Sequence, residues 1–169
     1  MQRTNPLPFA FLILLPVFAL LSLTGCYGYA SLRPVRGPEA DAQSHPRSLK
    51  LKMEIARDSH TMSVTLPDGE VCRGEYVHVR NGTVEPSDQA AAGSSQADLR
   101  DAWIDLYGTS YFEKHIAAKP RVQAVLTGNR NTTLKLDMCN GCAPRSPFNE
   151  DLYDGVATDN HGNTYHVRF

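Results

Sequence analysis

Apolar and polar residues alternate along most of the chain from residue 49 onward. The first such segment reads Leu-Lys-Leu-Lys-Met-Glu-Ile over residues 49–55. A period of two places successive side chains on opposite faces of a strand, so that one face is buried and the other meets water. The same alternation recurs over residues 62–66, 71–79, 122–126, 134–138 and 156–169, between turn sequences such as Pro-Asp-Gly at 67–69 and Gly-Asn-Arg-Asn at 128–131. The pattern therefore predicts antiparallel strands joined by short turns.

One segment has helical periodicity instead. Apolar residues between 99 and 107 recur at helical intervals, Asp98 suits the N-cap, and Gly108 suits the C-terminal end. We expect Trp103, the only tryptophan, to plug a mouth of a barrel. Residues 81–97 contain an Asn-Gly pair and an Ala/Gly/Ser run, which predict a flexible loop. About 6–8 short strands with one short helix favour an all-β fold, a small antiparallel sandwich or barrel.

The N-terminal 25 residues do not follow this pattern. Arg3 supplies a positive charge, residues 9–23 are almost all apolar, and two small residues precede Cys26. This arrangement is typical of a secretory signal peptide. A membrane-spanning helix is the alternative, but the apolar run is near the short end of the roughly 17–25 residues that a span needs, and it contains Pro16.

The segment Leu23-Thr24-Gly25-Cys26 resembles the lipobox of bacterial lipoproteins at every position. The resemblance implies that signal peptidase II removes residues 1–25 and that Cys26 becomes an acylated first residue. Two or more acyl chains anchor a protein stably without a spanning helix. Because Tyr27 rather than Asp follows the cysteine, the resemblance implies the outer membrane, with the protein facing the periplasm.

Cleavage leaves about 144 of the 169 residues, the size of one domain. Residues 26–47 contain three prolines and show no apolar periodicity, which predicts a flexible tether before a globular domain at 48–169. The net charge is −1, and Lys and Arg are scattered along the chain. We therefore expect no nucleic acid as a partner. The membrane and an envelope protein are the expected partners.

Three cysteines remain after Cys26, namely Cys72, Cys139 and Cys142. Export places them in an oxidising compartment, so we expect at least one disulfide. Cys139 and Cys142 can close a short loop, or Cys72 can join one of them across about 67 residues; chain entropy, at roughly 4 kcal/mol, favours the long link. A zinc site from these cysteines and a histidine is conceivable by ligand type, but only one pair has metal-like spacing. We expect no metal and no cofactor.

The Cys139-x-x-Cys142 motif also admits a thiol-redox interpretation. In redox proteins of this kind the motif opens a helix that lowers a thiol pKa, whereas Pro144 and Pro147 follow it here. The histidines are dispersed, and His166 is expected to point to solvent. We therefore expect no catalytic residues and no enzymatic activity.

Two segments, residues 66–74 (Leu-Pro-Asp-Gly-Glu-Val-Cys-Arg-Gly) and 155–165, resemble small uncharacterised Gram-negative envelope lipoproteins. Such families often have Gly-x-Cys in the last hairpin, where Ala157-Thr158 stands here. The resemblance implies an envelope lipoprotein with a non-enzymatic β domain for binding or structural support. One alternative is a periplasmic binding protein similar to the membrane-bound inhibitors of C-type lysozyme, although the Ser-Gly-x-x-Tyr motif of those inhibitors is not found here. The other alternative is a thiol-redox enzyme using Cys139 and Cys142.

Overall fold

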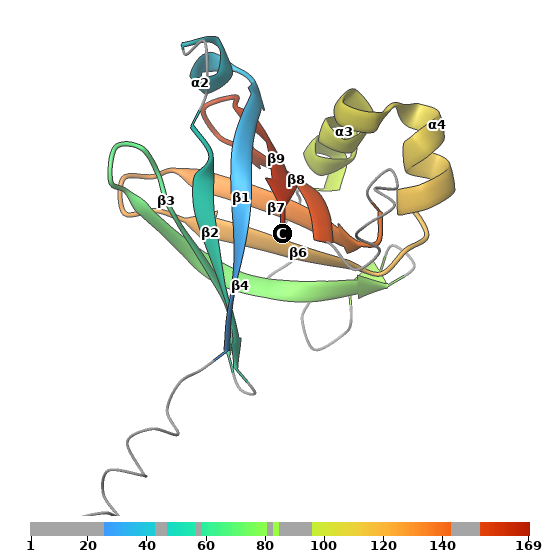
Figure 1. The fold of residues 1–169 in the computed structure, drawn as a ribbon, viewed down its shortest axis with the longest axis horizontal. Coiled ribbons are helices and arrows are strands. Elements are labelled where there is room, and N and C mark those ends of the chain that lie inside the picture. The colour runs from blue at the N-terminus through green and yellow to red at the C-terminus, as the bar shows by residue number, and fades with distance from the viewer. Residues whose placement is uncertain (1–25, 43–46, 57–58, 81–82, 85–95, 143–152) are drawn as a thin grey trace, which may run out of the picture.

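The computed structural model describes residues 26–42, 47–56, 59–80, 83–84, 96–142 and 153–169, and within them the main feature is a closed antiparallel barrel of eight strands (Figure 1). The strands are β1 (Cys26–Arg36), β2 (Leu49–Ala56), β3 (Ser59–Thr65), β4 (Val71–Arg80), β5 (Thr83–Val84), β6 (Arg121–Thr127), β7 (Thr133–Asn140), β8 (Tyr153–Asp159) and β9 (Thr164–Arg168). The predicted all-β fold is confirmed, and of the two predicted architectures the barrel is the one observed.

The sheet follows the order β3-β2-β1-β9-β8-β7-β6-β4-β5, and an additional pairing of β3 with β4 closes it. The two-residue β5 is an addition at the end of β4. All pairings are antiparallel, as the short turns require. Closure pairs the strand edges with one another, which removes the exposed edges that would otherwise recruit another chain.

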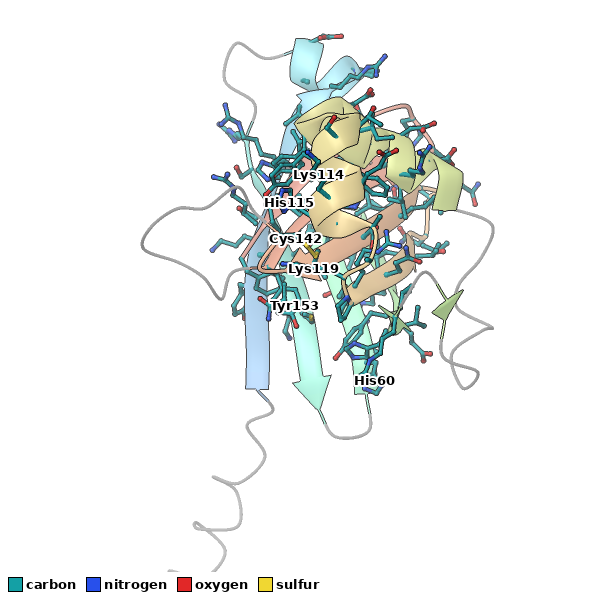
Figure 2. The ribbon with its side chains drawn as sticks, turned by 90° about the vertical axis from the view of Figure 1, so that its right-hand side faces the viewer. His60, Lys114, His115, Lys119, Cys142 and Tyr153 are labelled. Carbon is teal, nitrogen blue, oxygen red and sulfur yellow. A yellow bond between two sulfur atoms is a disulfide. The ribbon has the colours of Figure 1, made fainter. Side chains whose placement is uncertain are left out.

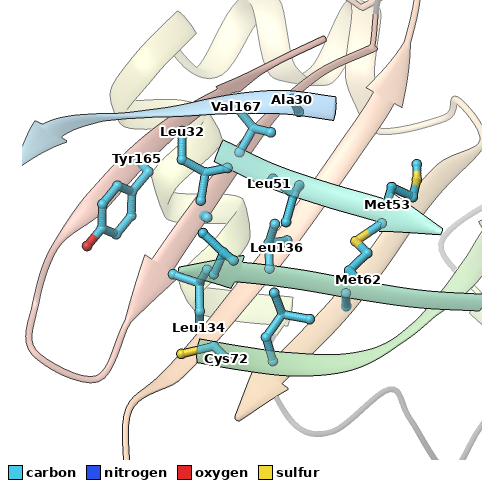
Figure 3. Close-up of a cluster of buried hydrophobic side chains, with 14 of the residues drawn as sticks. Ala30, Leu32, Leu51, Met53, Met62, Cys72, Leu134, Leu136, Tyr165 and Val167 are labelled. Carbon is cyan, nitrogen blue, oxygen red and sulfur yellow. The ribbon is translucent and has the colours of Figure 1, made fainter. Parts of the chain in front are cut away.

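Alternate side chains of every barrel strand point inward and fill the interior (Figure 3). Leu32, Leu51 and Leu136 are completely buried there. Met53 pairs directly with Met62 across β2 and β3, so their thioethers fill adjacent space. The interior is therefore a packed apolar core.

Gly74 lets β4 pass close to β6. A Cβ atom at this position would lie 2.0 Å from the carbonyl oxygen of Val125, a distance that no side chain tolerates. Glycine at such a point allows a strand to turn a barrel corner.

The predicted tether at residues 26–47 is wrong for most of its length. Residues 26–36 form β1, which pairs with β2 and with β9, and residues 38–41 form the short helix α2 (Pro38–Asp41). Ala30, Leu32 and Pro34 are buried in alternation. Alanine and proline are weak strand signals, and Pro34 sits where the pairing with β9 shifts register. Residues 43–46 lie outside the described part of the chain.

The predicted helix is confirmed as α3 (Gln96–Tyr107), which Gly108 ends with a φ of 83°. The prediction of Asp98 as its N-cap is wrong, because the helix begins at Gln96 and Asp98 lies in its first turn. The chain continues through α4 (Thr109–Tyr111) and the π-helical turn η2 (Phe112–Ile116), so the helical region is longer than predicted. Together these helices lie outside the barrel, against β7 and β8 (Figure 1). Of the predicted loop at 81–97, residues 83–84 belong to β5 and 96–97 to α3, and residues 85–95 lie outside the described residues. In the described ranges no helix has the length and apolar character of a membrane span.

Candidate functional site on the outer face of the barrel

A second apolar core lies between the helices and the outer face of the barrel. Trp103 and Ile116 from the helical region are completely buried against Val156 of β8. The prediction that Trp103 plugs the barrel mouth is therefore wrong, because its ring packs on the outer face of the sheet. We define the helix-covered face as this layer, made of α3, α4, η2 and the outward side chains of β7–β9.

Asp137 is a completely buried carboxylate of this layer. It faces outward from β7, and its Oδ2 accepts hydrogen bonds from Arg121 Nη1 at 2.6 Å and from Trp103 Nε1 at 2.9 Å. Burial raises the pKa of the Asp137 carboxyl, and the charge of Arg121 opposes that shift. Since both donors converge on one oxygen, Asp137 fixes α3 to β6 and β7 with a defined orientation.

Asp154 forms a second polar group under the same helix. Its Oδ1 lies 2.7 Å from His166 Nε2 on β9, and its Oδ2 accepts a hydrogen bond from the Tyr107 hydroxyl. The Tyr107 oxygen is also 3.1 Å from His166 Nε2. Burial, and then the hydrogen bond to Asp154, raise the pKa of Tyr107 well above its usual value, so this phenol stays protonated and donates.

The expectation that His166 points to solvent is wrong, because its side chain is only 15% exposed and contacts Asp154. The contact between Asp154, His166 and Tyr107 was not predicted from the sequence. Two patterns pointed to it. Tyr107 lies one helical turn after Trp103, and His166 alternates with the buried Tyr165 and Val167, which places His166 on the outer face of β9. A protonated tyrosine is a weak nucleophile, so the geometry resembles a structural hydrogen-bond network more than an activated catalytic group.

Four aromatic rings follow one face of the helical region at every fourth position. Ring centroids are 5.7 Å apart from Trp103 to Tyr107, 5.4 Å from Tyr107 to Tyr111, and 4.7 Å from Tyr111 to His115. Trp103 and Tyr107 lie four residues apart on α3, so they are neighbours on one helix face, whereas Gly108 ends that helix between Tyr107 and Tyr111. The ladder runs from the buried Trp103 to the exposed His115, which Figure 2 shows near Lys114 and Lys119.

The four cysteines of the chain occupy three different environments. Cys139 and Cys142 form a disulfide beneath η2, with their Cα atoms 5.5 Å apart. Cys72 is a free thiol, completely buried inside the barrel, where burial raises its pKa. Cys26 is the first residue of β1. The expected long link from Cys72 is therefore wrong, because β4 directs Cys72 to the inner face of the sheet and β7 directs Cys139 to the outer face.

The turn at the disulfide is held by the helical region. The Tyr111 hydroxyl donates to the Cys142 carbonyl at 2.8 Å, and Lys119 Nζ donates to the Gly141 carbonyl at 2.7 Å. Gly141 has a φ of 62°, which suits a tight turn. The three cysteines considered as zinc ligands do not come together, because Cys72 lies inside the barrel and Cys139 and Cys142 lie outside it. In the described parts of the chain there is no group of three or more His, Cys, Asp or Glu that could hold a metal ion.

A separate polar cluster closes the end of the barrel where the turns after β3 and β6 meet. Glu70 is 2% exposed, and its carboxylate accepts hydrogen bonds from Thr132 Oγ1 at 2.6 Å and from the Arg130 backbone N–H at 2.5 Å. The bond from Thr132 is the main reason that the pKa of Glu70 is lowered. A Cβ atom at Gly128 would lie 2.1 Å from Glu70 Oε1, so glycine is needed there.

Comparison with protein-family models, with curated proteins and with solved structures finds no significant match for this chain.

Proposed function

We propose that this protein is a membrane-anchored envelope lipoprotein whose barrel serves binding or structural support and not catalysis. The observation that carries this proposal is the packed interior of the barrel. Barrels that hold a small ligand keep an internal cavity for it, whereas leucines from several strands are completely buried inside this one. A partner would then be met on the outer surface.

The anchor in this proposal is Cys26, acylated after removal of residues 1–25, and the location is the outer membrane facing the periplasm. The lipobox at residues 23–26 supports it. Intact-mass and peptide analysis of protein purified from a Gram-negative host tests it directly. We expect residue 26 at the N-terminus of the wild type with its acyl chains, and a Cys26→Ala variant that keeps residues 1–25 and carries no acyl chain. Material that retains residues 1–25 or has an unmodified Cys26 would contradict the proposal.

The surface proposed to meet an envelope protein is the exposed end of the helix-covered face, around His115 and Lys119. Interfaces are enriched in rigid aromatic side chains, and the ladder brings aromatic rings to the surface at this end. A photo-crosslinking residue at position 115 tests this in intact cells, with position 50, exposed on β2, as the matched control. We expect a discrete adduct from position 115 only. Equal adducts from both positions would count against this face.

The disulfide does not favour a thiol-redox enzyme. Both Cys139 and Cys142 are buried, and Cys139 lies within β7, so the motif begins inside a strand. A reactive thiol needs access and a helix N-terminus or a nearby cation to lower its pKa. A structural cross-link is the function that this placement supports.

A further inference from the structure

No spacer separates the proposed lipid attachment from the folded barrel. Cys26 is the first residue of β1 and pairs with Ile55 of β2, and Tyr27 pairs with Glu54. A flexible tether of 22 residues would have let the domain move on the order of 25 Å from the bilayer. Acyl chains on Cys26 would instead hold one particular end of the barrel against the lipid.

This end of the barrel carries aromatic side chains close to Cys26. Tyr29 points outward from β1 and is 61% exposed, the highest value among the large apolar residues that the structure describes. The Phe169 ring covers Gly28, where a Cβ atom would lie 3.2 Å from Phe169 Cε1, and the Tyr153 ring is 5.8 Å from the Phe169 ring. Tyrosine is enriched where a protein meets lipid head groups, because its ring is apolar and its hydroxyl is polar.

The rings of His60, Tyr76 and His78 lie at the same end. Their centroids are 5.0 Å apart from His60 to Tyr76 and 5.8 Å from Tyr76 to His78, and both histidines are exposed. Figure 2 shows His60 toward the end at which β1 begins. The opposite end instead carries the charged turns with Asp68 and Arg130. The end at which β1 begins is therefore the one that carries both Cys26 and this group of aromatic rings.

We propose that the end of the barrel at which β1 begins rests on the bilayer surface, with Tyr29 at the level of the lipid head groups. This inference rests on the proposed acylation of Cys26. A strand rises about 3.3 Å per residue, so Tyr29 lies about 10 Å along β1 from Cys26. The head-group region on each side of a bilayer is about 5–8 Å thick, which the tyrosine side chain reaches. This end of the barrel therefore contacts the bilayer, and the helix-covered face stays accessible to a protein partner.

The test compares two positions on the outer face of the same strand. Val35 is 42% exposed and lies about 20 Å beyond Tyr29 along β1. A fluorescent label is attached to a cysteine in Tyr29→Cys or in Val35→Cys, using the acylated protein reconstituted in phosphatidylethanolamine–phosphatidylglycerol vesicles. The acylated Cys26, the buried Cys72 and the Cys139–Cys142 disulfide leave the introduced thiol as the reactive one.

Quenching by lipids that carry a nitroxide on the head group gives the readout. We expect the label at position 29 to be quenched at least threefold more than the label at position 35. Insertion of twelve Gly/Ser residues between Cys26 and Tyr27 should reduce the quenching at position 29 to the level of position 35. A second pair of labels, at His60 and at the exposed Asn129 of the opposite end, should show the same contrast.

Vesicle flotation and intact mass separate the two ways in which this experiment can fail. Acylated protein that floats with the vesicles but is quenched equally at positions 29 and 35 would overturn the docking of this end and leave the lipoprotein proposal standing. Protein without acyl chains would overturn the lipoprotein proposal and, with it, this inference.

Discussion

Leu136 and Asp137 are consecutive residues of β7, both completely buried, and they belong to two very different cores. Leu136 points into the barrel, where the buried side chains are almost all apolar. Asp137 points to the helix-covered face, where Arg121 and Trp103 bind its carboxylate. Apolar packing is non-directional, so it stabilises the barrel by filling its interior. Converging hydrogen bonds, in contrast, fix one orientation of a helix on a sheet. A single strand, β7, therefore supplies apolar packing on one face and a directional contact to the helix on the other.

Asp137→Ala should have the largest effect, a loss of about 3–5 kcal/mol in the free energy of unfolding, because it leaves the Arg121 charge buried without a partner. Urea unfolding, followed by circular dichroism and by Trp103 fluorescence, measures it. Arg121→Met combined with Asp137→Leu is the control, and should recover most of the loss because both charges are gone. A cost under about 1 kcal/mol for Asp137→Ala would show that the Asp137 carboxylate, with its bonds to Arg121 and Trp103, does not stabilise the packing of α3 on the sheet.

Leu136→Ala should cost about 3 kcal/mol, from lost apolar burial and the cavity left inside the barrel. The two neighbouring variants should differ in the native state. Trp103 keeps its hydrogen-bond partner in Leu136→Ala, so its emission should stay unchanged, whereas it should shift to longer wavelength in Asp137→Ala. A shift of equal size in both variants would mean that the two cores are not separate.

Replacing Cys139 and Cys142 by serine together should cost about 2 kcal/mol, since the closed loop is short. Thiol titration of the acylated wild-type protein sharpens this prediction. We expect no reactive thiol in the native state and one, from Cys72, after unfolding without reductant. Reactive thiols at both Cys139 and Cys142 in the native protein would contradict the disulfide and would support the thiol-redox alternative.

Glu70→Gln should have the smallest effect, and that effect should depend on pH. Because the hydrogen bond from Thr132 lowers the pKa of Glu70 below its ordinary 4.5, the carboxylate stabilises the folded state above that pH. The urea midpoint of the wild type should exceed that of the variant at pH 7, and the gap should narrow as the pH falls below 4.5. Glu75→Gln, which removes an exposed carboxylate from β4, is the control. A gap that stays constant from pH 7 to pH 3.5 would refute the assignment.

The disulfide differs from the pairing that chain entropy favours. Chain entropy favours a disulfide between Cys72 and Cys139 or Cys142, but only if the two sulfur atoms can approach each other in the folded protein. In the barrel, Cys72 and Cys139 lie on opposite faces of the sheet, so the sheet itself separates them. Gly141 then allows the short loop to close. The spacing of cysteines and the entropy of loop closure are properties of the unfolded chain. The face of the sheet on which each cysteine lies is set only when the strands pair.

The sequence by itself determined the class of fold, the position of α3 and most of the strands. It could do so because the strand period of two residues and the helix period of about 3.6 residues follow from local backbone geometry. The tertiary structure decided that the sheet closes, that residues 26–36 belong to it, and that Asp154 meets His166 and Tyr107 under the helix. These features depend on contacts between residues far apart in the chain, and a local pattern can indicate the face on which a residue lies but not the residue that it contacts.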